Sequence, residues 1–490
     1  MDYWGIAVLV TSFIILLSLG VPIAFSIGIS GILTMLVSIN ALPACTTFAH
    51  RMATGLDSFA LLAIPFFILA GNIMNSGGIA MRLINFARAL VGSIPGGLAF
   101  VNIFANMLFG AISGSAAASA SAIGSIMDPE MRKEGYDPHF NAAVNITSAT
   151  TGLSIPPSNI LIVYSLASGG ASIAALFIAG YFPGILTGIA LMLTAMSMLI
   201  YKNKGIKGVS TTLAKIFIFS VVILLVVIGI NYISKNYPPQ VLHTTWIVLG
   251  LLFASLIVYR TIKYWEQALY GMKTFLDALP SLLLLIIVVG GIIAGYFTAT
   301  EASAVAVLYS LILALIYREM KIKDLPDVIL RSVKTTAIVL LLVGTSIGLS
   351  WIMAYENIPQ NVSAGLLSIS KSPFIILLII NLILLFVGVF MDMTPAVLIF
   401  TPIFLPIVQN QLGLDPIHFG IIMVLNLSVG LCTPPVGSVL FIGCSVANVK
   451  IEKVIKPLLP MFAAMVVVLL LVTYIPEISL WLPRLFGLMK

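Results

Sequence analysis

Charged residues are scarce in this chain, and their scarcity determines its class. Asp, Glu, Lys and Arg make up 8% of the 490 residues, whereas hydrophobic residues make up 60%. So few charges cannot cover the surface of a water-soluble protein of this length, and the chain also lacks the alternating apolar and polar pattern of barrel strands. We therefore predict an all-α polytopic membrane protein.

Other missing features exclude several classes of function. The three cysteines, Cys45, Cys432 and Cys444, have no spacing typical of a disulfide or a metal site. There is no P-loop, and no polar block is long enough to form a nucleotide-binding domain. The net charge of +7 is distributed over short loops, which argues against a nucleic-acid partner. We expect neither an enzyme nor an organic cofactor.

The basic residues indicate which loops face the cytoplasm. By the positive-inside rule, short loops rich in Lys and Arg stay on the cytoplasmic side. The apolar segments between these loops then place both termini in the periplasm, in a multi-pass protein of the bacterial inner membrane. Most of the 24 Lys and Arg residues lie within 82–88, 132–133, 202–215, 260–273, 318–334 and 450–456.

One pattern, Gly-Leu-x-x-Pro-Pro, occurs twice, at 152–157 and at 430–435, with an offset of 278 residues. A double proline removes two backbone donors and cannot continue a helix, so each copy is expected to break an apolar span in its middle. Interrupted segments at matching places in two halves are typical of secondary transporters, whose binding sites lie at the interruptions. The same offset relates two further pairs, Gly110 with Gly388 and Asp137 with Asp415.

The repeat predicts a hairpin and a broken span in each half. The apolar stretches at 96–128 and 373–408 are each long enough for a re-entrant helical hairpin, and their flanking charges place the two hairpins on opposite faces of the membrane. The broken spans are expected at 140–166 and 418–446. The predicted fold is therefore a pair of inverted structural repeats. The remaining helices are expected near 5–20, 22–39, 58–80, 172–200, 278–296, 300–317, 335–353 and 457–475.

The first hairpin is expected to turn through the small residues at 110–119. The hydroxyls of Ser113 and Ser115, together with freed carbonyls, can coordinate Na⁺, while a helix that starts near Ala116 faces an anion. The alternative is ordinary packing of small residues between membrane helices. A hydrolase using Ser113 needs a base beside the serine, and no His or Lys is expected at that depth.

The second hairpin places an acid within an apolar region. Asp392 costs about 2.5–3.5 kcal/mol at the centre of a membrane helix, so it is expected to face a cavity or a cation. A simple N-cap role is the alternative, with Pro395 in the first turn of the next helix. Glu301, the other acid at membrane depth, starts a helix, and stabilisation of that helix N-terminus is its alternative role.

The broken spans expose carbonyl groups that lack helical donors, and such oxygens suit Na⁺. Ser158, Asn159 and Thr433 can add side-chain oxygens. A single proline in a membrane helix is usually only a kink, but two double-proline copies in register with two hairpins favour a functional role.

Taken together, these motifs resemble the large membrane subunit (M, DctM-type) of the tripartite ATP-independent periplasmic (TRAP) transporters. The resemblance implies an elevator-type fold like that of the ion-transporter superfamily. It also implies Na⁺-driven import of a carboxylate such as sialic acid or a C4-dicarboxylate, with a periplasmic binding protein (P subunit) and a small four-helix membrane subunit (Q) as partners. The motifs that carry it are the serine-rich 113–121, Ser-Ile-Pro-Pro-Ser-Asn at 154–159, the turn 298–302 and Cys-Thr-Pro-Pro-Val-Gly at 432–437, and it covers roughly 1–200 and 275–490.

The resemblance also implies which residues bind Na⁺ and substrate. One Na⁺ is expected between the first hairpin and the first broken span, and a second between the second hairpin and the second broken span. The implied ligands of the first ion are Ser113, Ser115, Gly152 and Pro156. Those of the second are Asp392, Thr394, Gly430, Thr433 and Pro434. The implied substrate residues are Ser115, Ser158, Asn159 and Thr394.

The segment 205–265 departs from the family pattern. It contains two apolar runs, at 216–233 and 245–259, and it is too short for a fused Q subunit, although it could replace part of that subunit's contacts. A stand-alone divalent-anion/Na⁺ symporter, which needs no binding protein, is the alternative function.

We expect the hairpins and broken spans to form a mobile transport domain within a scaffold. The expected divisions are 1–95 (scaffold helices), 96–171 (first hairpin and broken span), 172–204 (linking helix), 205–265 (inserted helix pair), 266–372 (scaffold helices), 373–447 (second hairpin and broken span) and 448–490 (C-terminal scaffold helix).

Overall fold

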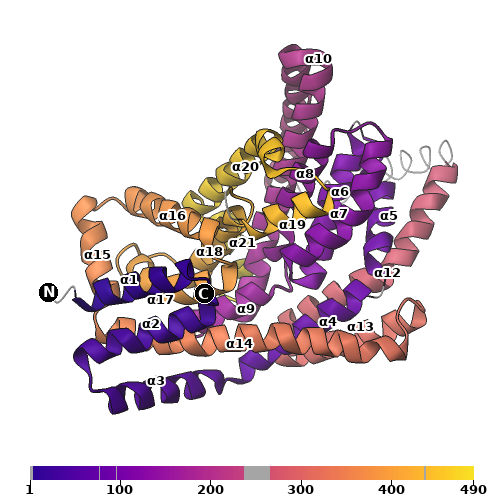
Figure 1. Ribbon diagram of the computed structural model, residues 1–490. Helices are drawn as coiled ribbons and strands as arrows, with labels where there is room; N and C mark the ends of the chain where they lie inside the picture. The colour runs from indigo at the N-terminus through magenta and orange to yellow at the C-terminus, as the bar shows by residue number, and fades with distance from the viewer. Residues whose placement is uncertain (1–3, 77, 95, 237–264, 435–436, 490) are drawn as a thin grey trace.

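The structure is a computed structural model that describes residues 4–76, 78–94, 96–236, 265–434 and 437–489. These residues form helices and turns, with no β-strand among them (Figure 1). Eight helical segments in this part of the chain are long and apolar enough to cross a membrane. The prediction of an all-α polytopic membrane protein is confirmed.

In the first half of the chain, several helices precede the first hairpin and the first broken span, and one long helix follows them. The helices are α1 (Trp4–Ser18), α2 (Ile23–Ser38), α3 (Ala41–Leu56), the 3₁₀ turn η1 (Phe59–Leu62), α4 (Ala63–Ser76), α5 (Ile79–Val91), α6 (Gly97–Ser113), α7 (Ala116–Lys133), α8 (Pro138–Ala149), η2 (Thr151–Leu153), α9 (Asn159–Ala167) and α10 (Ile173–Asn236).

The second half repeats this order, with two helices after its broken span. Its helices are α12 (Trp265–Ile293), α13 (Ala299–Ile316), η3 (Ile322–Asp324), α14 (Leu325–Tyr355), α15 (Ile358–Ile369), α16 (Pro373–Phe390), α17 (Met393–Asn410), α18 (Pro416–Gly430), α19 (Ser438–Val446), α20 (Ile451–Tyr474) and α21 (Glu477–Leu485).

Both hairpins and both broken spans are present where the repeat predicts them. Helices α6 and α7 are joined at Gly114, whose positive φ of 62° reverses the chain, and α16 and α17 are joined at Met391 and Asp392. The first broken span consists of α8 and α9, and the second of α18 and α19. Helices α3, α5, α15 and α21 were not predicted.

The helices form two packed groups. Helices α1 to α4, α13 and α14 lie along the lower edge of Figure 1, where α4 packs on α13 and α14 packs on α2 and α3. The hairpins and broken spans pack on one another above them. Helices α10 and α20 pack on each other and on the broken span helices α8 and α18. The division of the chain into transport and scaffold domains stays a prediction.

The 205–265 segment is described only in part. Its first 32 residues, up to Asn236, continue α10 beyond Gly205, where a non-helical backbone (φ 66°, ψ −168°) separates two helical parts. The apolar run at 216–233 is therefore helical. The second run, at 245–259, lies outside the described residues.

Paired glycines hold each hairpin against its broken span. A Cβ built on Gly110 would lie 2.9 Å from the Cα of Gly152, and one built on Gly388 would lie 3.1 Å from the Cα of Gly430. The 278-residue offset relates the two contacts to each other, because it aligns Gly110 with Gly388 and Gly152 with Gly430. Only glycine allows the two backbones to approach so closely, which explains why both copies carry it.

This contact gives a stability prediction with a matched control. A Cβ added at Gly430 would lie 2.6 Å from the Cα of Gly388, whereas nothing lies within 4 Å of one added at Gly365 in α15. We expect Gly430→Ala to lower the free energy of unfolding by about 1–3 kcal/mol, because backbone must shift. Gly365→Ala is expected to be neutral or stabilising by up to about 1 kcal/mol, because alanine favours the helix. Thermal unfolding in detergent measures both, and equal melting temperatures would contradict the close contact.

Buried amides tie the same elements together. The Asn106 side chain on α6 donates to Ser148 Oγ at 2.9 Å and Asn145 Oδ1 at 3.1 Å, both on α8. In the second half, Asn426 on α18 donates to Asn381 Oδ1 on α16 at 2.8 Å. Such bonds between membrane helices contribute about 0.6–2 kcal/mol each. Each hairpin is therefore fixed to its broken span by both packing and hydrogen bonds.

Candidate functional site

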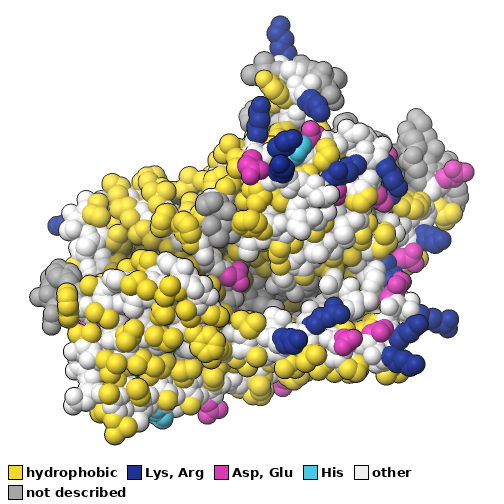
Figure 2. Space-filling view, in the orientation of Figure 1, with side chains coloured by type: hydrophobic (Ala, Val, Ile, Leu, Met, Phe, Trp, Pro, Cys, Tyr) yellow, Lys and Arg dark blue, Asp and Glu magenta, His cyan; other side chains and the backbone are white. Residues whose placement is uncertain are grey.

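The tips of the two hairpins meet the interruptions of the broken spans at a cavity of about 290 Å³. Helices α4 and α14 form the opposite wall, so the cavity lies between the two packed groups. Figure 2 shows the hollowed face, with Lys and Arg side chains gathered around its upper and lower right edges. The cavity brings together residues that are far apart in the sequence.

Five of the predicted site residues line this cavity. They come from both halves of the chain, as a site at the centre of a repeat requires. The residues are Ser113, Ser115, Asn159, Asp392 and Thr394.

The other predicted residues lie beside the cavity rather than in its lining. Ser158 is buried, and its hydroxyl donates to the Leu153 carbonyl at 2.5 Å. The Thr433 hydroxyl donates to the Val429 carbonyl at 2.9 Å. These hydroxyls are thus bonded to their own chain, although their oxygens keep free lone pairs. Gly152, Pro156, Gly430 and Pro434 also lie outside the lining, and their roles in Na⁺ binding stay predictions.

The serines at the first tip organise the start of α7. Ser115 is the N-cap, and its hydroxyl oxygen accepts a hydrogen bond from the Ala118 amide at 3.2 Å. Ser113 is buried at the end of α6, and its hydroxyl lies 3.4 Å from the Ser115 carbonyl oxygen. The tip therefore places two hydroxyls and a carbonyl oxygen close together at the cavity wall.

Asp392 occupies the N-cap position of α17, but its carboxylate makes no capping hydrogen bond. Its side chain is open to the cavity, and no Lys, Arg or His within the described part of the chain lies within 4.0 Å of it. The N-cap alternative thus accounts for the backbone at Asp392 but not for its side chain. An acid at membrane depth without a basic partner marks a candidate ion site.

Four helices begin at the cavity. The first residues of α7, α9, α17 and α19 all belong to its lining. Only α7 has a side-chain cap; α9, α17 and α19 have none. Uncapped N-termini present free N–H groups and the positive ends of helix dipoles, which together bind anions. The lining residues at the starts of the three uncapped helices are Asn159, Ile160, Met393, Thr394, Ser438 and Val439.

The cavity lining, as far as the structure describes it, contains no Lys, Arg or His. An anion there would be held by backbone amides and hydroxyls rather than by a basic side chain. Neither of the bases that the hydrolase alternative requires beside Ser113, a His or a Lys, lies in the described lining.

Glu301 takes the structural role that the sequence offered as its alternative. Its carboxylate accepts hydrogen bonds from the Thr298 amide and hydroxyl, both at 2.8 Å, in a capping box at the start of α13. Glu301 does not line the cavity. The 298–302 turn therefore serves to begin α13.

Three polar cavity residues were missed by the sequence analysis: Asn72, Thr335 and Ser438, which begins α19. Asn72 on α4 and Thr335 on α14 face the hairpin tips from the opposite wall, and Asn72 donates to Ser332 Oγ at 2.9 Å. Neither belongs to the repeat. The only signal in the sequence is a single amide within an otherwise apolar segment.

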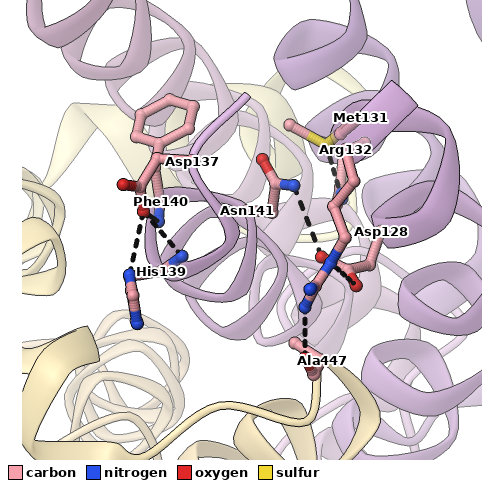
Figure 3. A network of polar contacts seen from close by, with 9 residues as sticks. Asp128, Met131, Arg132, Asp137, His139, Phe140, Asn141 and Ala447 are labelled. Atoms are coloured by element: carbon pink, nitrogen blue, oxygen red, sulfur yellow. Dashed lines mark hydrogen bonds and ion pairs between the residues drawn. The ribbon is translucent and has the colours of Figure 1, made fainter. Parts of the chain in front are cut away.

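A second polar cluster lies at the base of the first hairpin (Figure 3). Arg132 near the end of α7 pairs with Asp128 at 2.7 Å and donates to the Ala447 carbonyl after α19. Asn141 on α8 donates to the other Asp128 oxygen at 3.3 Å. This cluster joins the first hairpin to both broken spans.

The chain matches one family model over most of its length. The model of the "Tripartite ATP-independent periplasmic transporter, DctM component" matches residues 10–478. The chain is 53% identical over 484 residues to "Uncharacterized protein YgiK" of Salmonella typhimurium, covering 99% of this chain and 98% of that one. It is 37% identical over 466 residues to "C4-dicarboxylate TRAP transporter large permease protein DctM" of Pseudomonas aeruginosa, covering 94% and 95%. The resemblance stated from the motifs is confirmed.

A solved structure supports the fold. The chain is similar to the YdaH transporter of Alcanivorax borkumensis, with a TM-score of 0.60 and 12% identity over 93% of this chain and 91% of that one. At this identity the likeness concerns the fold alone. It confirms the predicted fold class.

Proposed function

Since the chain belongs to the family of DctM components of TRAP transporters, which are multi-pass membrane permeases, we propose that it carries out Na⁺-coupled import of a small carboxylate across the bacterial inner membrane. The single observation that carries this proposal is the cavity at the hairpin tips. It combines four helix N-termini with one unpaired carboxylate and, within its described lining, no basic side chain.

The unpaired carboxylate supports Na⁺ as the coupling ion. Asp392 supplies a negative charge, and the hydroxyls of Ser113, Ser115 and Thr394 supply neutral oxygens in the same cavity. Hard oxygen ligands of this kind suit alkali cations, and unwound backbone at such interruptions commonly coordinates Na⁺. Na⁺ bound here would neutralise Asp392 and remove its repulsion toward an anionic substrate.

The helix N-termini support a carboxylate as substrate. Free amides at the starts of α9, α17 and α19 can donate to carboxylate oxygens once Na⁺ is bound. A cavity of about 290 Å³ suits a small molecule rather than a peptide. The Pseudomonas aeruginosa relative is named for C4-dicarboxylates, and sialic acid is the other carboxylate that the sequence suggests.

An elevator movement would carry the loaded site across the bilayer. The hairpins and broken spans form one packed group, and α4 and α14 provide the facing wall. An inward-negative potential of 100 mV contributes about 2.3 kcal/mol per net positive charge moved. At least two Na⁺ per monoanion are therefore needed for the potential to drive accumulation.

Large permeases of this family work with a periplasmic binding protein and a small membrane subunit, as the word tripartite indicates. We propose both as partners of this chain. We also propose that both termini of this chain lie in the periplasm. The 205–265 insertion could replace part of the contact with the small subunit.

The coupling proposal is tested by uptake into proteoliposomes that contain the assembled transporter. We expect an inward Na⁺ gradient to drive accumulation of the radiolabelled carboxylate in the presence of the binding protein. Replacing Na⁺ with K⁺ is expected to reduce uptake to the level of empty liposomes, because K⁺ cannot replace Na⁺ at a small oxygen site. Unchanged uptake in K⁺ would rule out Na⁺ coupling.

A further inference from the structure

A second and larger cavity, of about 860 Å³, lies at the base of the first hairpin and shares no lining residue with the first. It is a groove between three elements: the α7–α8 turn, the end of the first part of α10 and the start of α20. Figure 2 shows basic side chains, with a histidine among them, gathered where α10 leaves the body of the protein. The proposed function gives this groove no role.

Three lysines give the groove its positive charge. Lys202 on α10 and Lys453 and Lys456 on α20 line it, and all three side chains are exposed. None of them has a carboxylate within 4.0 Å among the described residues. Three unpaired ammonium groups around one cavity repel each other, and a bound anion would relieve this repulsion.

The acidic residues of the groove do not neutralise these lysines. Asp137 accepts hydrogen bonds from the His139 amide at 2.8 Å and the Phe140 amide at 3.2 Å, and its oxygen lies 3.1 Å from His139 Nδ1. Partial burial would raise the pKa of Asp137, but these hydrogen bonds outweigh it and hold the pKa below its usual value. The Asp137 carboxylate thus binds the amides at the start of α8 rather than a lysine. Glu134 is the other acidic residue of the lining.

The groove also has an apolar side, where two membrane-spanning helices end. Met198 and Leu199 line one side, and Pro457 and Pro460 line the other. The candidate spans Ile173–Lys202 and Ile451–Tyr474 both terminate within a few residues of the lysines. The groove therefore has a basic end in the headgroup region and an apolar side toward the hydrocarbon.

We propose that this groove binds an anionic phospholipid, with the headgroup phosphate between Lys202, Lys453 and Lys456 and the glycerol and upper acyl chains along the apolar side. Basic pockets between membrane helices bind such headgroups, and lysines at helix ends extend toward them. A free phosphate ion would use the lysines but not the apolar side. The bound lipid would link the base of the first hairpin to α10 and α20.

The proposal is tested by native mass spectrometry of the purified full-length protein after delipidation and addition of cardiolipin or phosphatidylglycerol. We expect K202Q/K453Q/K456Q to reduce lipid retention at least fivefold relative to the wild type. The matched control is K321Q/K323Q/K371Q, which removes the same charge at exposed lysines outside the groove and is expected to retain lipid normally. Phosphatidylcholine, which carries no net charge, is expected to bind poorly to all three proteins.

Two further variants distinguish the possible outcomes. M198Q/L199Q changes only the apolar side and is expected to weaken lipid retention. Wild-type retention in the lysine variant, or an equal loss in the charge-matched control, would overturn the proposed site. Complete displacement of the lipid by 10 mM inorganic phosphate, with no effect of M198Q/L199Q, would show a phosphate site instead of a lipid site. Gel filtration of each variant confirms that it is folded.

Discussion

Asp392→Asn is expected to abolish Na⁺-coupled uptake while leaving the protein folded. The carboxylate is the only charged group in the described lining of the hairpin-tip cavity, and no basic side chain there compensates it. A polar contact to a charged group contributes about 1.5–3 kcal/mol. Loss of the contact between the Asp392 carboxylate and Na⁺ should therefore weaken Na⁺ binding by about tenfold to a hundredfold. Removal of an unpaired charge at membrane depth should, in contrast, stabilise the empty protein slightly.

The measurement is a Na⁺ titration of thermal stability, together with uptake at a fixed Na⁺ gradient. The wild type should be stabilised by Na⁺ according to its affinity, and the Asn variant should respond only at much higher concentrations. Asp327→Asn is the control, because Asp327 is exposed in the first turn of α14 and does not line the cavity. A normal Na⁺ response in the Asp392 variant would remove this carboxylate from the site.

The second large effect is expected from Ala117→Asp. Ala117 lies in the first turn of α7, is exposed and lines the cavity. A carboxylate at this position would be stabilised by the N-terminus of α7 and would add a negative charge to the cavity in which the anion is proposed to bind. If the introduced carboxylate lies about 4 Å from the substrate carboxylate, the two groups repel each other by about 4 kcal/mol at an effective dielectric constant of 20. Substrate uptake should therefore fall at least about a hundredfold.

Ser125→Asp is the control on the same helix, because Ser125 is exposed and lies outside the cavity. It should reduce uptake less than about twofold. The Na⁺ response of thermal stability should persist in the Ala117 variant, since an added carboxylate attracts cations. If the Ala117 variant imports the substrate as the wild type does, the substrate carboxylate does not bind in this cavity.

The repeat allowed the central architecture to be predicted from the sequence. A double proline ends a helix wherever it occurs, so the interruptions at 152–157 and 430–435 follow from the sequence without tertiary information. The 278-residue offset then identified the glycines at which each hairpin contacts its broken span. The cavity residues Ser113, Ser115 and Asp392 followed from the same reasoning.

The elements that were missed lack a local signal of this kind. Helices α3 and α5 carry Arg51, Arg82 and Arg88, and α15 and α21 are 12 and 9 residues long. Such helices are too short or too polar for a search based on continuous apolar spans. Their positions depend on what they pack against, which the sequence does not show.

The cavity wall on α4 and α14 was missed for a related reason. Asn72 and Thr335 become cavity residues only because the scaffold helices pack opposite the hairpin tips. Similarly, the family resemblance implied that Ser158 contacts substrate, whereas in the structure its hydroxyl donates to the Leu153 carbonyl. Which way a side chain points at an interruption depends on the local turn, and residue type alone does not determine it.

The most direct test is an electron cryo-microscopy map of the assembled transporter in Na⁺ with its carboxylate. The amide groups that begin α9, α17 and α19 should lie within hydrogen-bonding distance of the bound anion, with cation density beside Asp392. A carboxylate held by lysine or arginine side chains elsewhere, with the hairpin tips empty, would contradict the account.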